Sequence, residues 1–170
     1  LHFWASWVPG NEFWLRLPSA IAGILVPPLL YLCAIKAYGD RRTGWLAGML
    51  GVFSPTLIAY SQELRMYSLM ALEGSLLFCF FLEAFQQSHV RLKLWLGLGL
   101  VTALSLYTHY FTIPFLLCLD TLALGGFALQ KRWHTARAWF ASQAMAALAF
   151  VPWIILILQG RGGTQDYVAA

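Results

Sequence analysis

The sequence predicts an all-α membrane protein, a polytopic bundle of about six transmembrane helices. Of its 170 residues, 60% are hydrophobic and only 11% are charged, whereas soluble domains carry about 25% charged residues. This balance excludes an ordinary soluble enzyme, a disordered tail and a nucleic-acid-binding protein. Six apolar windows follow one another: Leu17–Tyr38, Gly44–Ala59, Leu64–Phe85, Leu94–Phe111, Thr112–Leu129 and Ala138–Leu158.

Each window is expected to be a helix that crosses the membrane, because a helix of about 20 residues spans a hydrocarbon layer of about 30 Å. The windows are too long for barrel strands, which need only about 10 residues. Pro27 and Pro28 should bend the first helix, and Pro152 the last. The second window is only marginally long. Ser54 followed by Pro55 is typical of a cap and a first-turn proline, so this window should break there and restart as a short outer segment.

The basic residues predict how the helices are oriented. Eight of the eleven lie in alternate connections: Lys36, Arg41, Arg42, Arg91, Lys93, Lys131, Arg132 and Arg137. The positive-inside rule assigns these connections to the cytoplasm, so both chain ends should be extracytoplasmic. Four tryptophans are expected in the headgroup layer at the cytoplasmic ends of their helices: Trp45, Trp95, Trp133 and Trp139.

Residues 1–170 are expected to form a single membrane domain. The chain begins with Leu1 rather than methionine, and we expect it to be an excerpt of a longer protein. Cys33, Cys79 and Cys118 lie within apolar runs at spacings that match no zinc or disulfide pattern. We expect them to pack as small hydrophobic side chains.

Three arginines remain on the predicted outer side, where basic residues are disfavoured: Arg16, Arg65 and Arg161. Such a residue needs a lipid phosphate or a functional anion as its partner. Arg161 lies in a glycine-rich stretch and is interpreted as an exposed loop residue. Arg16 follows Glu12 by four positions, which permits an ion pair on the surface of an amphipathic helix, and Pro18 should mark the start of the first span.

The environment of Arg65 is unusually polar. The segment Tyr60–Tyr67 also contains Gln62 and Glu63. If the segment is helical, Tyr60, Glu63 and Tyr67 share one face, and Glu63 lies about 200° away from Arg65. A guanidinium can bind phosphate oxygens through paired hydrogen bonds, and a carboxylate can orient a hydroxyl or hold a cation. The alternative is an ion pair that only fixes the end of a helix.

A second polar cluster surrounds His109 and Tyr110 on the same predicted face, and it could instead be part of an aromatic belt. Two further carboxyl groups, Glu73 and Asp120, are expected near mid-membrane. Acids within a membrane are candidates for a proton relay. They can equally be protonated and hydrogen-bonded to a tyrosine or serine between helices.

These motifs, in their order and spacing, resemble bacterial polytopic glycosyltransferases of the GT-C class. The resemblance is carried by Glu12–Ser19, Tyr31–Arg42, Ser54-Pro55, Tyr60–Tyr67 and Tyr107–Phe111, and it covers nearly the whole chain. The most similar group is that of the dolichyl-phosphate-mannose protein mannosyltransferases. This group comprises family 39 and its relatives, including the RgtA/B/C/D-like domain and the lipid A aminoarabinose transferases.

The resemblance implies an integral protein of the bacterial inner membrane that transfers a hexose or pentose from a polyprenyl-phosphate carrier. The acceptor would be a lipid, glycan or protein on the extracytoplasmic face, with membrane lipids as further partners. In this family the principal catalytic carboxylate lies in the first outer loop, which is expected before Leu1, and Glu12 does not match it. The excerpt alone is therefore expected to be inactive.

The resemblance also implies roles for the polar clusters. Arg65 and Arg16 would hold the donor phosphate, His109 would donate a hydrogen bond to it, and Glu63 would orient His109, an arginine or a divalent metal ion. No cofactor is assigned, and the metal stays an alternative. The predicted substrate-binding set is Arg65, Glu63, His109, Tyr110, Arg16, Tyr60, Gln62 and Tyr67.

Two other classes of protein fit parts of the pattern. A transporter or lipid flippase would also have several spans and intramembrane acids, and Asp120 would be its candidate proton carrier. Such folds usually contain paired halves, and no matching half is recognisable here. A non-catalytic membrane scaffold is the other alternative, because the expected base lies outside the excerpt.

Overall fold

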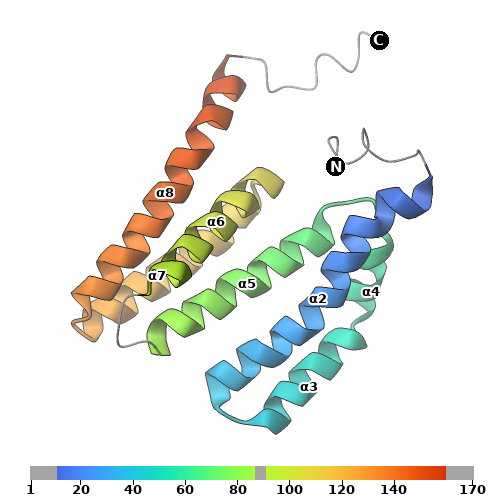
Figure 1. The fold of residues 1–170 in the computed structure, drawn as a ribbon, viewed down its shortest axis with the longest axis horizontal. Helices are drawn as coiled ribbons and strands as arrows, with labels where there is room; N and C mark the ends of the chain where they lie inside the picture. Colours follow the sequence, from blue (N-terminus) through green and yellow to red (C-terminus); the bar gives the residue numbers. More distant parts are fainter. Residues whose placement is uncertain (1–10, 87–90, 160–170) are drawn as a thin grey trace.

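The computed structural model describes residues 11–86 and 91–159, and within them every regular element is an α-helix. The expected outer position of the two chain ends and the expected loop at Arg161 concern residues outside these ranges. Figure 1 shows the arrangement of the helices. The helices are α2 (Glu12–Tyr38), α3 (Arg41–Val52), α4 (Pro55–Gln62), α5 (Tyr67–Gln86), α6 (Leu92–Thr108), α7 (Thr112–Leu129) and α8 (Trp133–Leu158).

Helix α5 joins the two halves of the bundle. On one side α2 packs against α3, α4 and α5, and on the other α6 and α7 pack against α5 and α8. Figure 1 shows α5 running between these two groups. The end of the bundle where α4 meets α5 and α6 meets α7 is called the loop end below. The opposite end, where α2 meets α3 and α7 meets α8, is called the basic end.

The predicted all-α helix bundle is confirmed, but fewer than the six predicted spans are found. Within the described residues, four helices are long and apolar enough to cross a membrane, namely Glu12–Tyr38, Tyr67–Gln86, Thr112–Leu129 and the part of α8 from Trp133 to Leu156. Helix α6 is apolar but shorter. The second apolar window is divided as predicted: the Ser54 hydroxyl accepts from the Leu57 N–H at 3.4 Å, and Pro55 begins α4.

The first helix begins earlier than predicted. Asn11 caps it by accepting a hydrogen bond from the Phe13 N–H at 3.2 Å, so helix α2 begins at Glu12. Pro18 then lies inside the helix instead of at its start. Because proline removes a single backbone donor, a well-capped and well-packed helix can continue through it. The predicted ion pair between Arg16 and Glu12 is present at 3.3 Å.

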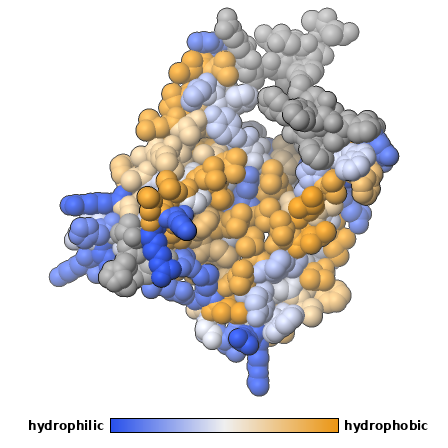
Figure 2. Space-filling view, in the orientation of Figure 1, coloured by the Kyte–Doolittle hydropathy of each residue, from blue (hydrophilic) through white to orange (hydrophobic). Residues whose placement is uncertain are grey.

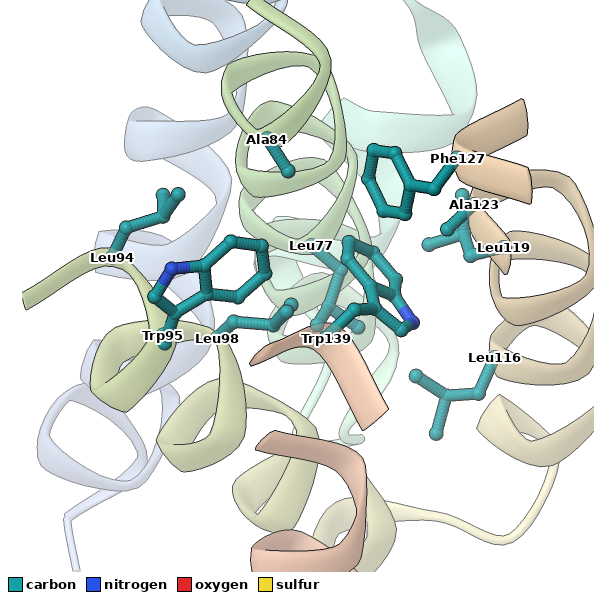
Figure 3. Packing of buried hydrophobic residues seen from close by; sticks show 10 residues of the cluster. All are labelled: Leu77, Ala84, Leu94, Trp95, Leu98, Leu116, Leu119, Ala123, Phe127 and Trp139. Carbon is teal, nitrogen blue, oxygen red and sulfur yellow. The ribbon is translucent and has the colours of Figure 1, made fainter. Parts of the chain in front are cut away.

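The core lies where α5, α6, α7 and α8 meet. Phe127 and Trp139 are almost fully buried there, and the Phe127 ring packs 6.1 Å from the Trp139 ring (Figure 3). In lipid, close packing of this kind holds helices together, because burial from water contributes little between helices. Trp95 is also buried in this core. Trp95 and Trp139 therefore pack inside the bundle, whereas Trp45 and Trp133 are exposed, and the headgroup level expected for all four stays a prediction.

At the basic end, polar side chains connect neighbouring helices to one another. Lys36 of α2 forms an ion pair with Glu83 of α5, and the Gln86 side chain donates to the Lys36 carbonyl. Arg132 donates to the carbonyls of Phe85 at 2.8 Å and Ala84 at 3.1 Å. In Figure 2, hydrophobic side chains cover the middle of the face shown, and hydrophilic side chains project from its left and lower edges.

A disulfide joins Cys33 of α2 to Cys79 of α5, with Cα atoms 5.3 Å apart. The expectation that both cysteines pack as free hydrophobic side chains is therefore wrong. A spacing of 46 residues gave no indication of pairing, because the pairing depends on how two distant helices cross. Cys118 is free and exposed.

Candidate functional site at the loop end

A bend between α4 and α5 carries the predicted arginine. Helix α4 ends at Gln62, and Glu63 has extended backbone angles, φ −86° and ψ 149°. Helix α5 begins only at Tyr67, so residues 63–66 are not helical. The predicted helical arrangement of this segment is wrong. The predicted separation of Glu63 and Arg65 by about 200° is wrong as well, because both residues line one cavity.

Contacts with α2 fix the bend. The buried Ser19 hydroxyl donates to the Arg65 carbonyl at 3.2 Å, which ties the bend to the first half of α2. The side chain of Ser61 lies directly over Gly23, where a Cβ atom would have no room. On either side of the bend, the rings of Tyr60 and Tyr67 are 4.8 Å apart. The backbone that carries Arg65 is therefore held by neighbours on both sides.

A cavity of about 610 Å³ opens beside this bend. Arg16 and Arg65 are both exposed there, and Arg16 also pairs with Glu12. Among residues 11–86 and 91–159, Arg65 and Glu63 form no ion pair. Two guanidinium groups beside one cavity favour a phosphate or carboxylate ligand, since each can donate several hydrogen bonds to an anion. The cavity is lined by Arg16, Ala59, Gln62, Glu63, Leu64 and Arg65.

A second cavity, of about 690 Å³, is also lined by Arg65. Leu64 and Arg65 line both cavities. The second cavity is mainly apolar and also reaches the end of α6. An elongated amphiphile with one anionic group fits the chemistry of this pair of cavities. The lining residues are Pro18, Ser19, Leu64, Arg65, Met66, Leu69, Leu104, Tyr107 and Thr108.

His109 and Tyr110 follow the last residue of α6 but line neither cavity. The Nδ1 atom of His109 accepts from the Phe111 N–H at 3.1 Å, so in a neutral ring Nε2 carries the proton. The His109 ring stacks on Tyr110 and on Phe111, with centroids 4.5 and 5.0 Å apart. The structure thus brings Arg16, Gln62, Glu63 and Arg65 together and leaves the histidine in a neighbouring aromatic stack.

The two intramembrane acids bind partners that differ from the expected tyrosine or serine. Glu73 is buried in α5, and its Oε1 accepts from the Thr108 hydroxyl at 2.7 Å. Asp120 of α7 accepts from the Trp139 indole N–H at 2.8 Å. Thr108 belongs to the Tyr107–Phe111 segment that carries the resemblance, but the sequence assigned it no role in the site, and the structure places it in the wall of the second cavity.

No metal site is formed within the part of the chain that the structure describes: no three His, Cys, Asp or Glu side chains gather there closely enough to hold an ion. The single carboxylate at the Arg65 cavity is that of Glu63. One carboxylate supplies too few ligands for a divalent cation, which prefers six or more oxygens. The described residues of this cavity are better suited to an anion.

Comparison with known proteins identifies the family. The sequence pattern of the dolichyl-phosphate-mannose-protein mannosyltransferases matches residues 5–156, which is most of the chain. Neither a search of curated proteins nor a search of solved structures finds a match. The match includes helices α2 to α7 in full, together with the residues of both cavities lined by Arg65. The chain therefore belongs to the dolichyl-phosphate-mannose-protein mannosyltransferase family.

Proposed function

We propose that this chain is part of an integral-membrane glycosyltransferase. The enzyme transfers a sugar from a polyprenyl-phosphate carrier to an acceptor at the extracytoplasmic face of a bacterial inner membrane. The observation that supports this proposal is Arg65, which forms no ion pair with the described residues and lines both a polar and an apolar cavity. The donor has the same two parts, an anionic phosphate and an isoprenoid chain. Family membership supports the transfer of a sugar.

The proposed reaction is an inverting displacement. An acceptor hydroxyl attacks the anomeric carbon, the bond from that carbon to the phosphate oxygen breaks, and polyprenyl phosphate leaves with the electron pair. A general base takes the hydroxyl proton, a step that contributes about 10²–10⁴-fold in rate. In this proposal the base is the carboxylate of the family's first outer loop, to which the resemblance assigns this role.

Arg65 and Arg16 stabilise the leaving phosphate. Preorganised cations act most strongly where negative charge develops during the reaction, and the backbone of Arg65 is already fixed by Ser19. Gln62 and Glu63 complete the polar cavity, and Glu63 can orient a guanidinium. The roles predicted for His109 and Tyr110 stay predictions, as does the involvement of a divalent metal.

The test uses the full-length protein in membrane vesicles with radiolabelled mannosyl polyprenyl phosphate. Hydrogen bonds to charged groups contribute about 1.5–3 kcal/mol, so Arg65→Ala should lower transfer by about 10- to 100-fold. Arg41→Ala at the basic end is the matched control and should retain full transfer. Unchanged transfer in Arg65→Ala would show that Arg65 does not hold the phosphate.

The transporter alternative is not supported by a specific contact. Its candidate proton carrier, Asp120, is bound to Trp139 and lines neither cavity at the loop end. The same vesicles separate the remaining alternatives. A scaffold would release no polyprenyl phosphate from any labelled donor, and a flippase would move the donor across the bilayer with its sugar still attached.

A further inference from the structure

Glu73 is a buried acid whose presence packing does not explain. Only 6% of the residue is exposed. Its Oε1 accepts a hydrogen bond from Thr108, but its Oε2 has no hydrogen-bond partner within the described parts of the chain. A buried polar atom without a partner is destabilising, so native proteins contain few of them. A leucine would pack at this position without that cost.

The partner of Glu73 lies in the wall of the apolar cavity. Thr108 is the last residue of α6, and it lines this cavity together with Arg65 and Tyr107. The Tyr107 hydroxyl donates to the Ala149 carbonyl of α8 at 2.7 Å. The end of α6 is therefore attached to α5 through Glu73 and to α8 through Tyr107. These two hydrogen bonds set where the α6 side of the cavity lies relative to Arg65.

The hydroxyl of Thr108 has one proton but two acceptors. Glu73 Oε1 lies 2.7 Å away and the Leu104 carbonyl 3.0 Å away. When the proton points to Leu104, a protonated Glu73 can donate to the Thr108 oxygen. A glutamine at position 73 can accept from Thr108 or donate to it, so it can preserve the contact in both arrangements. An alanine removes the contact.

We propose that Glu73 is a positioning residue for the polyprenyl-phosphate site. Through Thr108 it fixes the α6 side of the cavity that receives the lipid next to the phosphate. This inference rests on the proposed function. Because Glu73 does not line the cavity, its loss should weaken binding of the lipid phosphate and leave the chemical step largely unaffected.

Asp120 provides a matched control. Like Glu73, it is an acid within a helix of the bundle that accepts one hydrogen bond from another helix. Its partner Trp139 belongs to the hydrophobic core, and neither residue lines a cavity at the loop end. Asp120→Ala therefore removes a comparable interhelical contact without altering the cavity wall.

The experiment measures binding of polyprenyl phosphate alone to the full-length protein in nanodiscs, and then sugar transfer in vesicles. Glu73→Ala should raise Kd and the donor KM about 10-fold with kcat changed less than about threefold, as expected when one hydrogen bond that positions a binding wall is lost. Glu73→Gln should restore both values. Thr108→Val should have the same effect as Glu73→Ala, and the double variant should be no worse than either single variant.

Asp120→Ala should lower the thermal midpoint but leave Kd and KM unchanged. Equal effects of Glu73→Ala and Asp120→Ala on stability, with no change in Kd, would overturn the inference. If Glu73→Ala does not fold, Thr108→Val and Glu73→Gln together decide: a raised Kd in Thr108→Val with a wild-type Kd in Glu73→Gln supports the inference, and a raised Kd in both overturns it. Tight binding of polyprenyl phosphate without any sugar transfer would contradict the proposed function and not the role of Glu73. The Kd of polyprenyl phosphate for the Glu73 variants would still test that role.

Discussion

Asp40 shows how one carboxylate determines where a helix begins. It caps α3: Oδ2 accepts from the N–H of Thr43 at 3.1 Å, and Oδ1 accepts from the N–H of Arg42 at 3.2 Å. The Thr43 hydroxyl also donates to Oδ2. These donors favour the charged form, and the N–H of Thr43 has the largest effect. They hold the pKa of Asp40 below its ordinary value of 3.8.

This cap predicts a pH-dependent stability. Because the pKa of Asp40 is lower in the folded than in the unfolded state, its contribution is fully present above 3.8 and is lost as the pH falls through the folded-state pKa. Asp40→Asn keeps a capping side chain but does not titrate. In detergent micelles at neutral pH, wild type should have a higher thermal midpoint than Asp40→Asn. The difference between the two midpoints should disappear in acid, where Asp40 is protonated. A difference that is independent of pH would contradict this assignment.

At the scale of elements, α3 packs against α2 through glycines. Gly44, Gly48 and Gly51 are all buried and recur at intervals of four and three residues, so they share one face of α3. A Cβ atom on Gly51 would lie 2.9 Å from Leu30 Cδ1 and 3.3 Å from Pro27 Cα. This close approach lets two neighbouring helices pack in lipid, where small residues favour association.

Gly51→Val should therefore destabilise the protein, because overpacking a close interface costs about 1–3 kcal/mol. Gly125→Val on α7 is the matched control, since a Cβ atom there would meet no atom within 4 Å among the described residues. The control should melt close to wild type. Thermal melting followed by circular dichroism in detergent checks both variants, and equal midpoints would show that the α2–α3 contact tolerates a larger residue.

The sequence was sufficient to predict helices whose signals are local. The break at Ser54-Pro55 was correctly predicted, because a cap and a first-turn proline act within one turn. The bend at residues 63–66 was missed, since it depends on a hydrogen bond from Ser19, which is 46 residues away. Arg65, which the sequence predicts to bind the donor phosphate, lines two cavities, but the arrangement of its neighbours could be seen only in the fold.

At the scale of the whole molecule, contacts between distant helices determine positions of side chains that the composition could not predict. The hydrophobic pattern separated membrane helices from connections, but it could not show that Trp139 is buried against α5, α6 and α7. Likewise, the hydrogen bond between Thr108 and Glu73 of α5, on which the positioning role rests, could be seen only in the structure. Such positions depend on which helices are neighbours, and a single sequence does not contain that information in a local form.

Orientation in the membrane is a prediction for the whole molecule. The basic connections should face the cytoplasm, because translocation of lysine and arginine across the membrane is disfavoured. A fluorescent protein fused after Gln130 should therefore fluoresce, and alkaline phosphatase fused after Tyr110, at the loop end, should be active. Exchanging the two reporters between the two sites is the control and should silence both. The reverse pattern would put the Arg65 cavities in the cytoplasm, where an extracytoplasmic acceptor could not reach them.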